Sequence, residues 1–283
     1  MDWLEKIQQP KYWLLAIAAA LVSLHLTYLT QTDNSDLMSM SILLWLAIGS
    51  LVWDKMEKGE GLKLESGVFA SAIGIFLIVL VLVRSVSPAG YHLRISPFIS
   101  IWGLCLLAGG FQGIRYYWKE LVIGSLFFFY PVFTYLLQAI NLPTITAQFS
   151  TFTLWAAGFQ VYREGVIIFL PTGRVEVFGA CSGVESILQM LNIAVLFLLL
   201  VPTTKLQKVI CIIVAGLLGF AVNGVRVALL AVLVASRNMD AFEYWHGGSA
   251  TFIFSIISVA LFGVFCWLIF LRELTTNSDE EEA

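Results

Sequence analysis

The sequence predicts an all-α integral membrane protein with about eight transmembrane helices. Of its 283 residues, 59% are hydrophobic and 12% are charged. The mean hydropathy of +0.87 is far above that of a soluble domain. The apolar residues also form runs of about 20, the length that a helix needs to cross the hydrocarbon core of a bilayer. We therefore expect one polytopic membrane domain over residues 1–283.

Eight apolar runs divide the chain. The first run continues at once into further apolar sequence, so we interpret it as a retained helix and not as a cleaved secretory signal. An even number of spans places both termini on the same side of the membrane. The predicted spans are Tyr12–Thr30, Leu37–Trp53, Gly67–Val83, Ile95–Gly110, Leu121–Ile140, Val184–Val201, Lys208–Ala235 and Ala250–Leu271.

The lysines predict which side that is. They precede the first span or lie in the loops after the second, fourth and sixth spans, and the alternate loops contain none. By the positive-inside rule, both termini and the acidic tail at 272–283 are then cytoplasmic. The formal charge of −3 argues against a nucleic-acid partner. The lysines are Lys6, Lys11, Lys55, Lys58, Lys63, Lys119, Lys205 and Lys208.

A long segment between the fifth and sixth spans is predicted to lie on the extracytoplasmic side. Large apolar residues recur there at helical spacing, with threonines, Gln148 and Ser150 between them, which is typical of an amphipathic helix on the membrane surface. Val166–Leu170 and Arg174–Phe178 flank a turn and predict a small β-hairpin. An ordered loop without chemistry is the alternative, but loops of this length are uncommon without a function. The apolar residues are Ile145, Phe149, Phe152, Trp155 and Phe159.

Cys181 follows this segment, at the start of the sixth span. The free amide N–H groups and the dipole of a helix N-terminus favour a thiolate over a thiol, so Cys181 is placed as a nucleophile would be. A small residue at a tight helix start is the alternative interpretation. Cys105, Cys211 and Cys266 lie inside apolar spans and are predicted to be packing residues.

Two further polar residues are predicted to lie at the level of Cys181. An arginine in an apolar span costs at least about 2.5 kcal/mol, so Arg226 needs a partner or a task. It lies 18 residues after Lys208, which corresponds to about 27 Å of helix and places it near the outer boundary. Asn223, one turn earlier, is positioned to hold its guanidinium. His246 precedes the last span and is the candidate acid–base group.

The remaining histidines have no such setting. His25, inside the first span, is expected to be hydrogen-bonded or to face a lumen, and His92 is expected in a solvated loop. The chain has three histidines and no CxxC pair, so the sequence predicts no metal site and no cofactor. The enzyme hypothesis therefore depends on the thiol.

The motifs Ala180–Gly183 and Asn223–Arg226, followed by His246 before the last span, resemble those of the exosortases and archaeosortases. These are integral membrane cysteine transpeptidases. The third motif residue is histidine in exosortases and arginine in archaeosortases, so the chain is similar to the exosortases, and in particular to their cyanobacterial branch. The resemblance implies that Cys181 is the nucleophile and that Arg226 is essential.

The resemblance also implies a catalytic portion at 161–271, in which Ser182, Gly183 and Asn223 support the nucleophile. The implied substrates are exported proteins with a C-terminal sorting signal: a Pro-Glu-Pro-like motif, a membrane helix and a basic cluster. They would be cleaved through a thioester on the cysteine and transferred to an unknown acceptor at the outer face of the inner (plasma) membrane. Arg163 or Arg174 could pair with the acidic residue of the motif.

Two other functions stay open at this point. A transporter could also hold Arg226 and Asn223 inside a helix bundle, and it would be expected to have further polar residues through the middle of several spans. A non-catalytic membrane scaffold would require none of the three candidate residues. Replacing Cys181 by alanine would then leave the processing of any partner unchanged.

Overall fold

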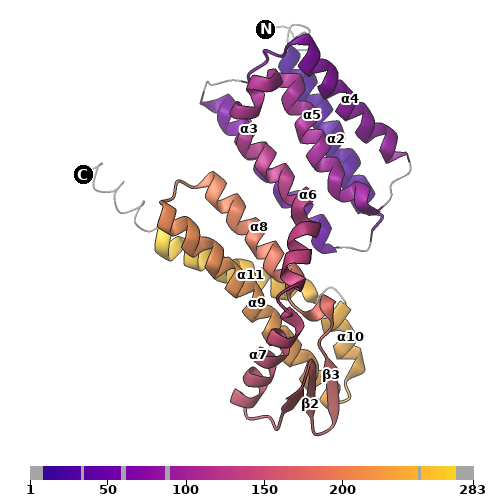
Figure 1. Ribbon diagram of the computed structural model, residues 1–283, viewed down its shortest axis with the longest axis vertical. Coiled ribbons are helices and arrows are strands. Elements are labelled where there is room, and N and C mark those ends of the chain that lie inside the picture. Colours follow the sequence, from indigo (N-terminus) through magenta and orange to yellow (C-terminus); the bar gives the residue numbers. More distant parts are fainter. Residues whose placement is uncertain (1–8, 33–34, 59–61, 87–89, 248–249, 272–283) are drawn as a thin grey trace, which may run out of the picture. The chain divides into compact units, whose positions relative to one another are not determined.

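The computed structural model describes residues 9–32, 35–58, 62–86, 90–247 and 250–271 (Figure 1). These residues are mostly helical, with one small sheet. They form two compact units, which meet in sequence between Tyr130 and Pro131. The acidic tail predicted at 272–283 lies outside the described residues, and the division into one domain with a catalytic portion at 161–271 stays a prediction.

Unit 1 is a group of apolar helices. Its longest helix, α5, packs against both α4 and α2. It starts five residues before the predicted position and changes direction at Gly110, which has a positive φ of 57°. The helices are α2 (Pro10–Leu29), α3 (Ser35–Glu57), α4 (Val68–Ser85), α5 (Gly90–Tyr116) and most of α6 (Trp118–Gln138).

Both histidines of unit 1 lie in helices and have polar neighbours. His25 is buried in α2, with its Nδ1 3.2 Å from the Ser96 hydroxyl and its Nε2 3.3 Å from the Ser41 hydroxyl. The expectation that His25 is hydrogen-bonded is therefore confirmed. His92 lies in α5, 3.4 Å from the Ser85 hydroxyl. Its assignment to a loop was wrong because α5 begins earlier than its apolar run.

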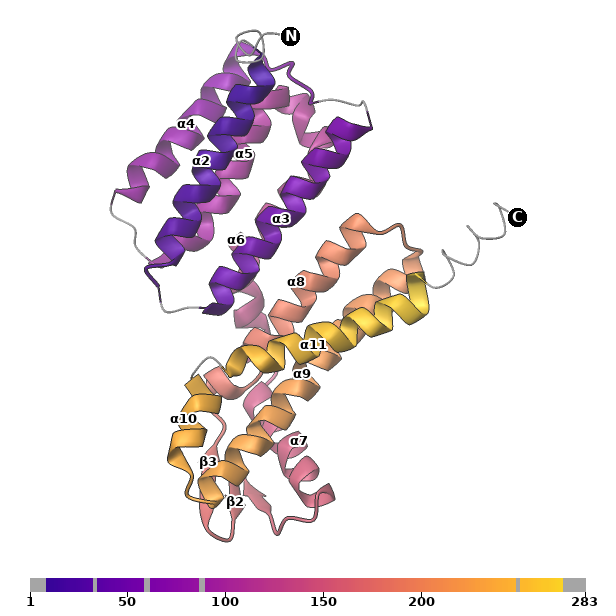
Figure 2. The same cartoon turned by 180° about the vertical axis from the view of Figure 1, so that it is seen from behind.

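Unit 2 combines further helices with the sheet. α9 lies at its centre and contacts α7, α8, α10, α11 and β3 (Figures 1 and 2). The elements after α6 are α7 (Leu142–Ala156), β1 (Tyr162–Glu164), β2 (Ile167–Leu170), β3 (Gly173–Glu176), the 3₁₀ turn η1 (Gly179–Cys181), α8 (Val184–Leu200), α9 (Lys205–Ala235), α10 (Met239–Gly247), α11 (Thr251–Cys266) and the π-helical turn η2 (Trp267–Leu271).

All eight predicted spans are helices among the described residues. Six helices are long and apolar enough to cross a membrane, and the bent helix α6 makes a seventh if its two halves form one span. The eighth, α8, has 17 residues and is at the short end of the range for a spanning helix. The prediction of an all-α, multi-pass membrane protein is confirmed.

The boundary of α9 follows from its sequence. Thr204 and Gln207 form a capping box, in which the threonine hydroxyl accepts from the Gln207 amide and the glutamine side chain accepts from the Thr204 amide. These two bonds satisfy amide groups that a helix start leaves without partners. The helix therefore begins at Lys205, three residues before the predicted start.

The helix α7 confirms the predicted amphipathic pattern, but its polar side faces the protein. Thr146, Ser150 and Leu154 are buried, whereas Phe152 and Trp155 are 60% and 66% exposed. Small hydroxyl residues allow close packing and can bond to neighbouring main chains, so they suit a buried helix face. The side of α7 that carries Phe152 and Trp155 is not covered by other parts of the described chain.

The sheet has three antiparallel strands in the order β1-β2-β3, one more than the predicted hairpin. The β2–β3 pair is the expected hairpin, with Ile168 opposite Val175. The strand β1 was missed because it has only three residues and shows no alternation of its own. It pairs with β2 by placing Arg163 opposite Ile168.

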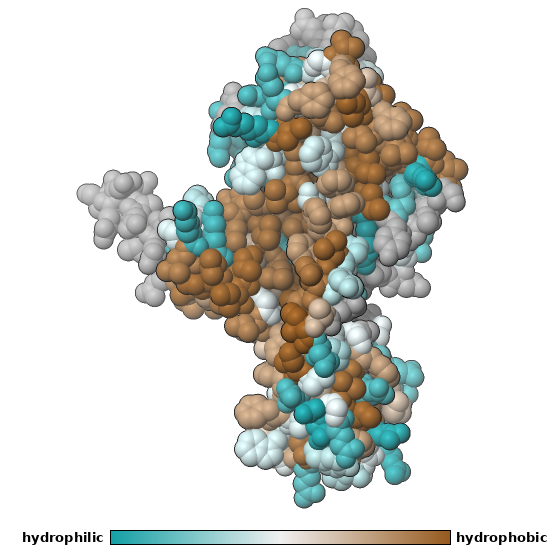
Figure 3. Space-filling view, viewed as in Figure 1, coloured by the Kyte–Doolittle hydropathy of each residue, from teal (hydrophilic) through white to brown (hydrophobic). Residues whose placement is uncertain are grey.

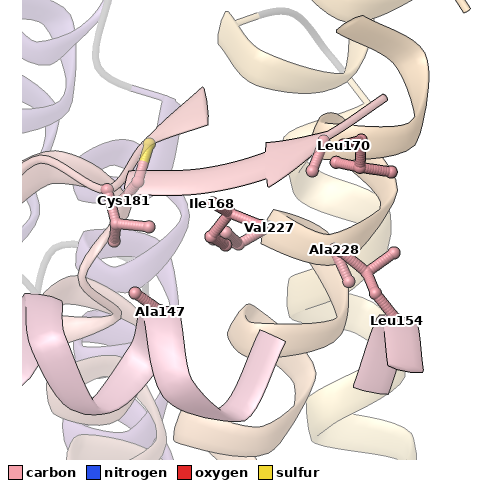
Figure 4. Packing of buried hydrophobic residues seen from close by; sticks show 9 residues of the cluster. Ala147, Leu154, Ile168, Leu170, Cys181, Val227 and Ala228 are labelled. Carbon is pink, nitrogen blue, oxygen red and sulfur yellow. The ribbon is translucent and has the colours of Figure 1, made fainter. Parts of the chain in front are cut away.

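The sheet and α7 pack on the C-terminal half of α9. Their shared core contains Ala147 from α7, Ile168 and Leu170 from β2, and Val227 and Ala228 from α9. Figure 4 shows Cys181 at one end of this cluster. In Figure 3, hydrophilic residues gather around the sheet and α10 and again near the loop between α8 and α9, with a hydrophobic belt between them.

Candidate active site

The turn before α8 fixes the backbone of Cys181. The Cys181 amide donates to the Phe178 carbonyl, and the Ser182 amide and hydroxyl both donate to the Gly179 carbonyl. Gly183 then caps α8 with a positive φ of 90°, a conformation that costs other residues free energy. A Cβ at Gly183 would also lie 2.9 Å from the Asn223 amide nitrogen. Glycine is therefore required here for two reasons.

Asn223 supports the nucleophile directly. Its buried side chain donates from Nδ2 to the main-chain carbonyl of Cys181, at 2.9 Å. The sequence predicts that this side chain holds the guanidinium of Arg226, but in the structure it bonds to the turn before α8 instead. The bond links the middle of α9 to the turn that carries the thiol.

Two hydroxyl residues of α7 complete this support, and sequence reasoning missed both of them. Thr146 donates to the Ser182 carbonyl at 2.7 Å, and Ser150 donates to the Gly224 carbonyl at 2.8 Å. They are one turn apart on the buried face of α7. Their spacing of four residues is visible in the sequence, but nothing in the pattern shows that this face meets the cysteine turn.

His246 comes from a short helix, α10, that the sequence analysis did not predict. Asn238 caps this helix by accepting from the Ala241 amide at 3.1 Å. The Nε2 atom of His246 lies 3.4 Å from Sγ of Cys181. The imidazole stacks on Phe242, one turn earlier, with ring centroids 5.0 Å apart. The helix and the stacking together orient the imidazole toward the thiol.

Arg226 connects α9 to the end of α10. Its Nη2 donates to the main-chain carbonyl of His246 at 2.6 Å. A cation at the C-terminal end of a helix is stabilised by the helix dipole and by the free carbonyl groups there. The Nε atom of Arg226 is buried and has no hydrogen-bond partner among the residues that the structure describes. One N–H group of the guanidinium therefore lacks a partner among these residues, and the charge of Arg226 acts on both Cys181 and His246.

Burial decides the protonation of this pair. Burial raises the pKa of the Cys181 thiol, and the nearby Arg226 guanidinium opposes this effect by lowering it. Burial also lowers the pKa of His246, and Arg226 lowers it further. A neutral thiol therefore faces a neutral imidazole near neutral pH. The thiolate that we expected from the helix terminus is not favoured in this state, because desolvation outweighs the positive charge.

The two candidate recognition arginines lie on opposite faces of the sheet. Residues directly opposite on neighbouring strands share a face. Arg163 shares its face with the buried Ile168 and donates to the Gly165 carbonyl within its own turn. Arg174 is exposed, opposite Phe169, and Phe169 stacks on Tyr162 at 4.8 Å. Of the two arginines, Arg174 is the one open to a ligand.

The other cysteines are buried and free, as packing residues would be: Cys105 in unit 1, and Cys211 and Cys266 between α9 and α11. In the described part of the chain, no group of three or more His, Cys, Asp and Glu side chains is placed to hold a metal ion.

The family comparison matches the same region of the chain. A family model described as transmembrane exosortase (Exosortase_EpsH) matches residues 31–263. The chain belongs to the transmembrane exosortase family. The match includes Cys181, Arg226 and His246 and extends over most of both units. No curated protein and no solved structure matches the chain. The cyanobacterial branch of the exosortases stays a prediction.

Proposed function

We propose that this exosortase is a membrane cysteine transpeptidase, and that it cleaves the C-terminal sorting signals of exported proteins. The observation that supports this most is the contact of 3.4 Å between Sγ of Cys181 and Nε2 of His246, with the Arg226 guanidinium bonded to the same histidine residue. A nucleophile and a base within reach, with a third group that orients the base, is the general arrangement for nucleophilic catalysis.

The reaction starts from the neutral pair. Sγ of Cys181 attacks the carbonyl carbon of the scissile peptide bond while its proton passes to Nε2 of His246. Nε2 can accept only in the tautomer that carries its proton on Nδ1. The free Nε–H of Arg226 is available to the oxyanion of the tetrahedral intermediate, where a fixed cation stabilises the developing charge.

Collapse of the intermediate breaks the carbon–nitrogen bond. The leaving amine takes the proton from His246, and the acyl group stays on Cys181 as a thioester. The acceptor nucleophile then loses its proton to His246 and attacks the thioester. The carbon–sulfur bond breaks, and the departing Sγ takes the proton from His246, which regenerates the thiol. Asn223 and Thr146 act as positioning residues in each step, because they hold two successive main-chain carbonyls, those of Cys181 and Ser182.

We propose that the sheet recognises the sorting motif. An extended peptide can bond to the main chain of an edge strand without regard to its sequence. The exposed Arg174 is then the group that pairs with an acidic side chain of the motif. Tyr162 and Phe169, stacked beside it on the same face, offer an apolar surface to the neighbouring residues of the motif.

The membrane orientation that we propose is the one that the lysines predict. Both termini are cytoplasmic, and the cysteine turn lies on the extracytoplasmic side of the inner membrane. The membrane helix of a sorting signal would then cross the bilayer with its motif at the level of Cys181, and the peptide bond would be cleaved outside the cell.

Capture of the acyl-enzyme tests the proposal. The enzyme in lipid nanodiscs would be incubated with a labelled sorting-signal peptide and quenched at low pH. We expect a label on Cys181 that hydroxylamine releases, as it does a thioester, and none in Cys181→Ala. The matched variant Cys211→Ala should be labelled like the wild type. Cleavage of the peptide by Cys181→Ala would contradict the proposal.

A further inference from the structure

The short helix α10 places an aromatic ring directly against the proposed base. The ring of Phe242 and the imidazole of His246 lie nearly parallel, at an angle of 13° and with their centroids 5.0 Å apart. The two residues are one helical turn apart, and side chains at that spacing are neighbours on a helix surface. The ring therefore lies on a face of the imidazole, where it can act on the charge of His246 as well as on its orientation.

Contacts at both ends of α10 hold this stacked pair in place. The Asn238 side chain accepts from the Ala241 amide at 3.1 Å, and the Asn238 main-chain carbonyl accepts from the Phe242 amide at 3.0 Å. Near the other end, the ring of Trp245 packs edge-on against that of Phe254 in α11, with centroids 5.7 Å apart. A helix of nine residues is marginal by itself, so α10 depends on these contacts.

The proposed reaction creates a positive charge on the imidazole, and it does so beside another cation. When the proton of Cys181 passes to Nε2, His246 becomes an imidazolium. Arg226 is bonded to the main-chain carbonyl of the same residue at 2.6 Å. Burial and this guanidinium both lower the pKa of His246, so both oppose its protonation. A group that attracts the imidazolium would therefore lower the barrier to attack.

The charged groups around α10 come from several elements. α10 packs against α9 and α11. α9 contributes Arg226, and the sequence of α11 contains no charged residue. On α10 itself, Asp240 and Glu243 are exposed, so solvent screens their carboxylates. His246 is in the last turn of α10, where the helix dipole favours a cation. None of these groups changes when only the ring at position 242 is altered.

We propose that Phe242 is a positioning residue that acts through His246, because its aromatic face stabilises the imidazolium formed during attack by Cys181. The face of an aromatic ring carries the negative part of its quadrupole and attracts a cation within about 6 Å of the centroid. A neutral imidazole gains little from this attraction and an imidazolium gains it in full. The contact therefore favours the state after proton transfer. The inference rests on the proposed function, which requires His246 to accept a proton.

Fluorine atoms on the ring test the inference, because they withdraw charge from the aromatic face and hardly change its shape. Phe242 would be replaced by phenylalanines with one, two or three ring fluorines in the full-length protein in lipid nanodiscs. We expect kcat/KM for acyl-enzyme formation to fall stepwise, by about two- to fivefold over the series, as for the loss of a cation–π contact at an exposed site. The acid limb of cleavage should move down by about half a pH unit, because a weaker attraction lowers the pKa of His246.

Control positions separate the charge of the ring from its packing. Phe254 is the matched control, because its ring packs against Trp245 and not against an imidazole. Three fluorines at position 254 should leave both the rate and the acid limb unchanged. Phe242→Leu occupies similar space without an aromatic face and should resemble the trifluorinated ring. Phe242→Tyr keeps the face and should resemble the wild type. Heating curves followed by intrinsic fluorescence identify any variant that fails to fold.

Two outcomes would overturn the inference. Equal rates and equal acid limbs across the fluorine series would show that the ring only packs. A slower Phe242→Leu with an unchanged acid limb would show that the ring only orients the imidazole. Failure of the proposed function is a separate result, in which wild-type Cys181 forms no acyl-enzyme. NMR titration of His246 then still tests the attraction, since its pKa should fall with each added fluorine.

Discussion

At the scale of single residues, the site combines a buried thiol with a neutral base. Desolvation keeps the proton on Cys181, and Arg226 reduces this effect without overcoming it. His246 is neutral over a wide pH range, because burial and Arg226 both lower its pKa. The imidazole is therefore ready to accept a proton at the moment of attack, and the thiol is protected from reactions with other electrophiles until then.

The pH dependence of alkylation follows from these two shifts. A raised pKa means less thiolate at any given pH. The rate of reaction of Cys181 with iodoacetamide should therefore reach half its maximum at a higher pH than the rate of an unperturbed cysteine does. Arg226→Ala removes the charge that opposes this shift and should move the pH of the midpoint further up. Arg226→Lys should lie between the two. The rate is measured by mass spectrometry of the peptide that contains Cys181.

The same substitution should move the acid limb of substrate cleavage. Because Arg226 lowers the pKa of His246, its loss raises that pKa, and the histidine becomes protonated at a higher pH. Any residual cleavage by Arg226→Ala should then fall off at a higher pH than in the wild type. If wild-type Cys181 reached half its maximal alkylation rate at a lower pH than a free thiol does, both predictions would be contradicted. That result would indicate a preformed thiolate.

At the scale of the elements, α7 acts as a brace for the cysteine turn. Its buried face donates one hydrogen bond to the turn, from Thr146, and one to α9, from Ser150. Gly224 allows this close approach, because a Cβ there would lie 2.3 Å from the ring of Phe149. The nucleophile is thus held by two helices besides its own, which is how a turn at a helix start can be kept in one conformation.

Removing one hydroxyl from α7 tests this role. Thr146→Val leaves the Ser182 carbonyl without its buried donor and should destabilise the protein by about 1 to 3 kcal/mol. It should also slow cleavage, because the cysteine turn loses a support. Thr151→Val is the matched control, since Thr151 bonds to the Ala147 carbonyl within its own helix. Unfolding temperatures and cleavage rates of both variants are measured in parallel, and equal effects would exclude the brace.

The positions of the two arginines in the sheet predict different effects on substrate recognition. Arg174 is exposed beside Tyr162 and Phe169, whereas Arg163 bonds within its own turn. Arg174→Gln should raise the KM for a sorting-signal peptide with an acidic motif and leave the alkylation of Cys181 unchanged. Arg163→Gln should have a smaller effect on KM. Arg174→Glu should be partly rescued by a peptide that carries lysine in place of the acidic residue.

Failure of that rescue, together with an unchanged KM for Arg174→Gln, would remove the sheet from substrate recognition. The sheet would then serve to close the site beside α9, and the motif would have to be recognised by other elements of unit 2.

At the scale of the whole molecule, the length of α9 relates the site to the membrane. Its 31 residues span about 46 Å, some 16 Å more than the roughly 30 Å hydrocarbon core. The sheet packs beside its last residues, where the Thr172 hydroxyl donates to the Ala235 carbonyl at 2.5 Å. Arg226 lies nine residues before the end of α9, which is about 14 Å along the helix. The proposed orientation then places the site near the outer end of that core.

Labelling from one side of the membrane tests the orientation. Single cysteines would be introduced at exposed positions of a Cys181→Ala protein, in which the three native thiols that remain are buried. Cysteines at Glu164 and Asp240 should react with an impermeant maleimide in cells whose outer surface is accessible. Cysteines at Lys58 and Lys205 should react only after the membrane is opened. The reverse pattern would place the site in the cytoplasm and exclude it from processing exported proteins.

The sequence by itself determined the membrane class, all eight helical segments, the amphipathic helix and one hairpin, because hydropathy and periodicity act locally along the chain. It also singled out Cys181, Arg226 and His246, since a thiol at a helix start and an arginine in an apolar run are unusual wherever they pack. Short elements such as β1 and α10 were missed because a few residues show no period.

Only the tertiary structure decided how these residues act on one another. It turned Asn223 from Arg226 to the carbonyl of Cys181 and brought Thr146 to the same turn. It also reversed the expected ionisation, because the pKa of Cys181 depends on how far packing removes water from the thiol. Burial and hydrogen bonding depend on contacts between segments that are distant in sequence, and no local pattern records them.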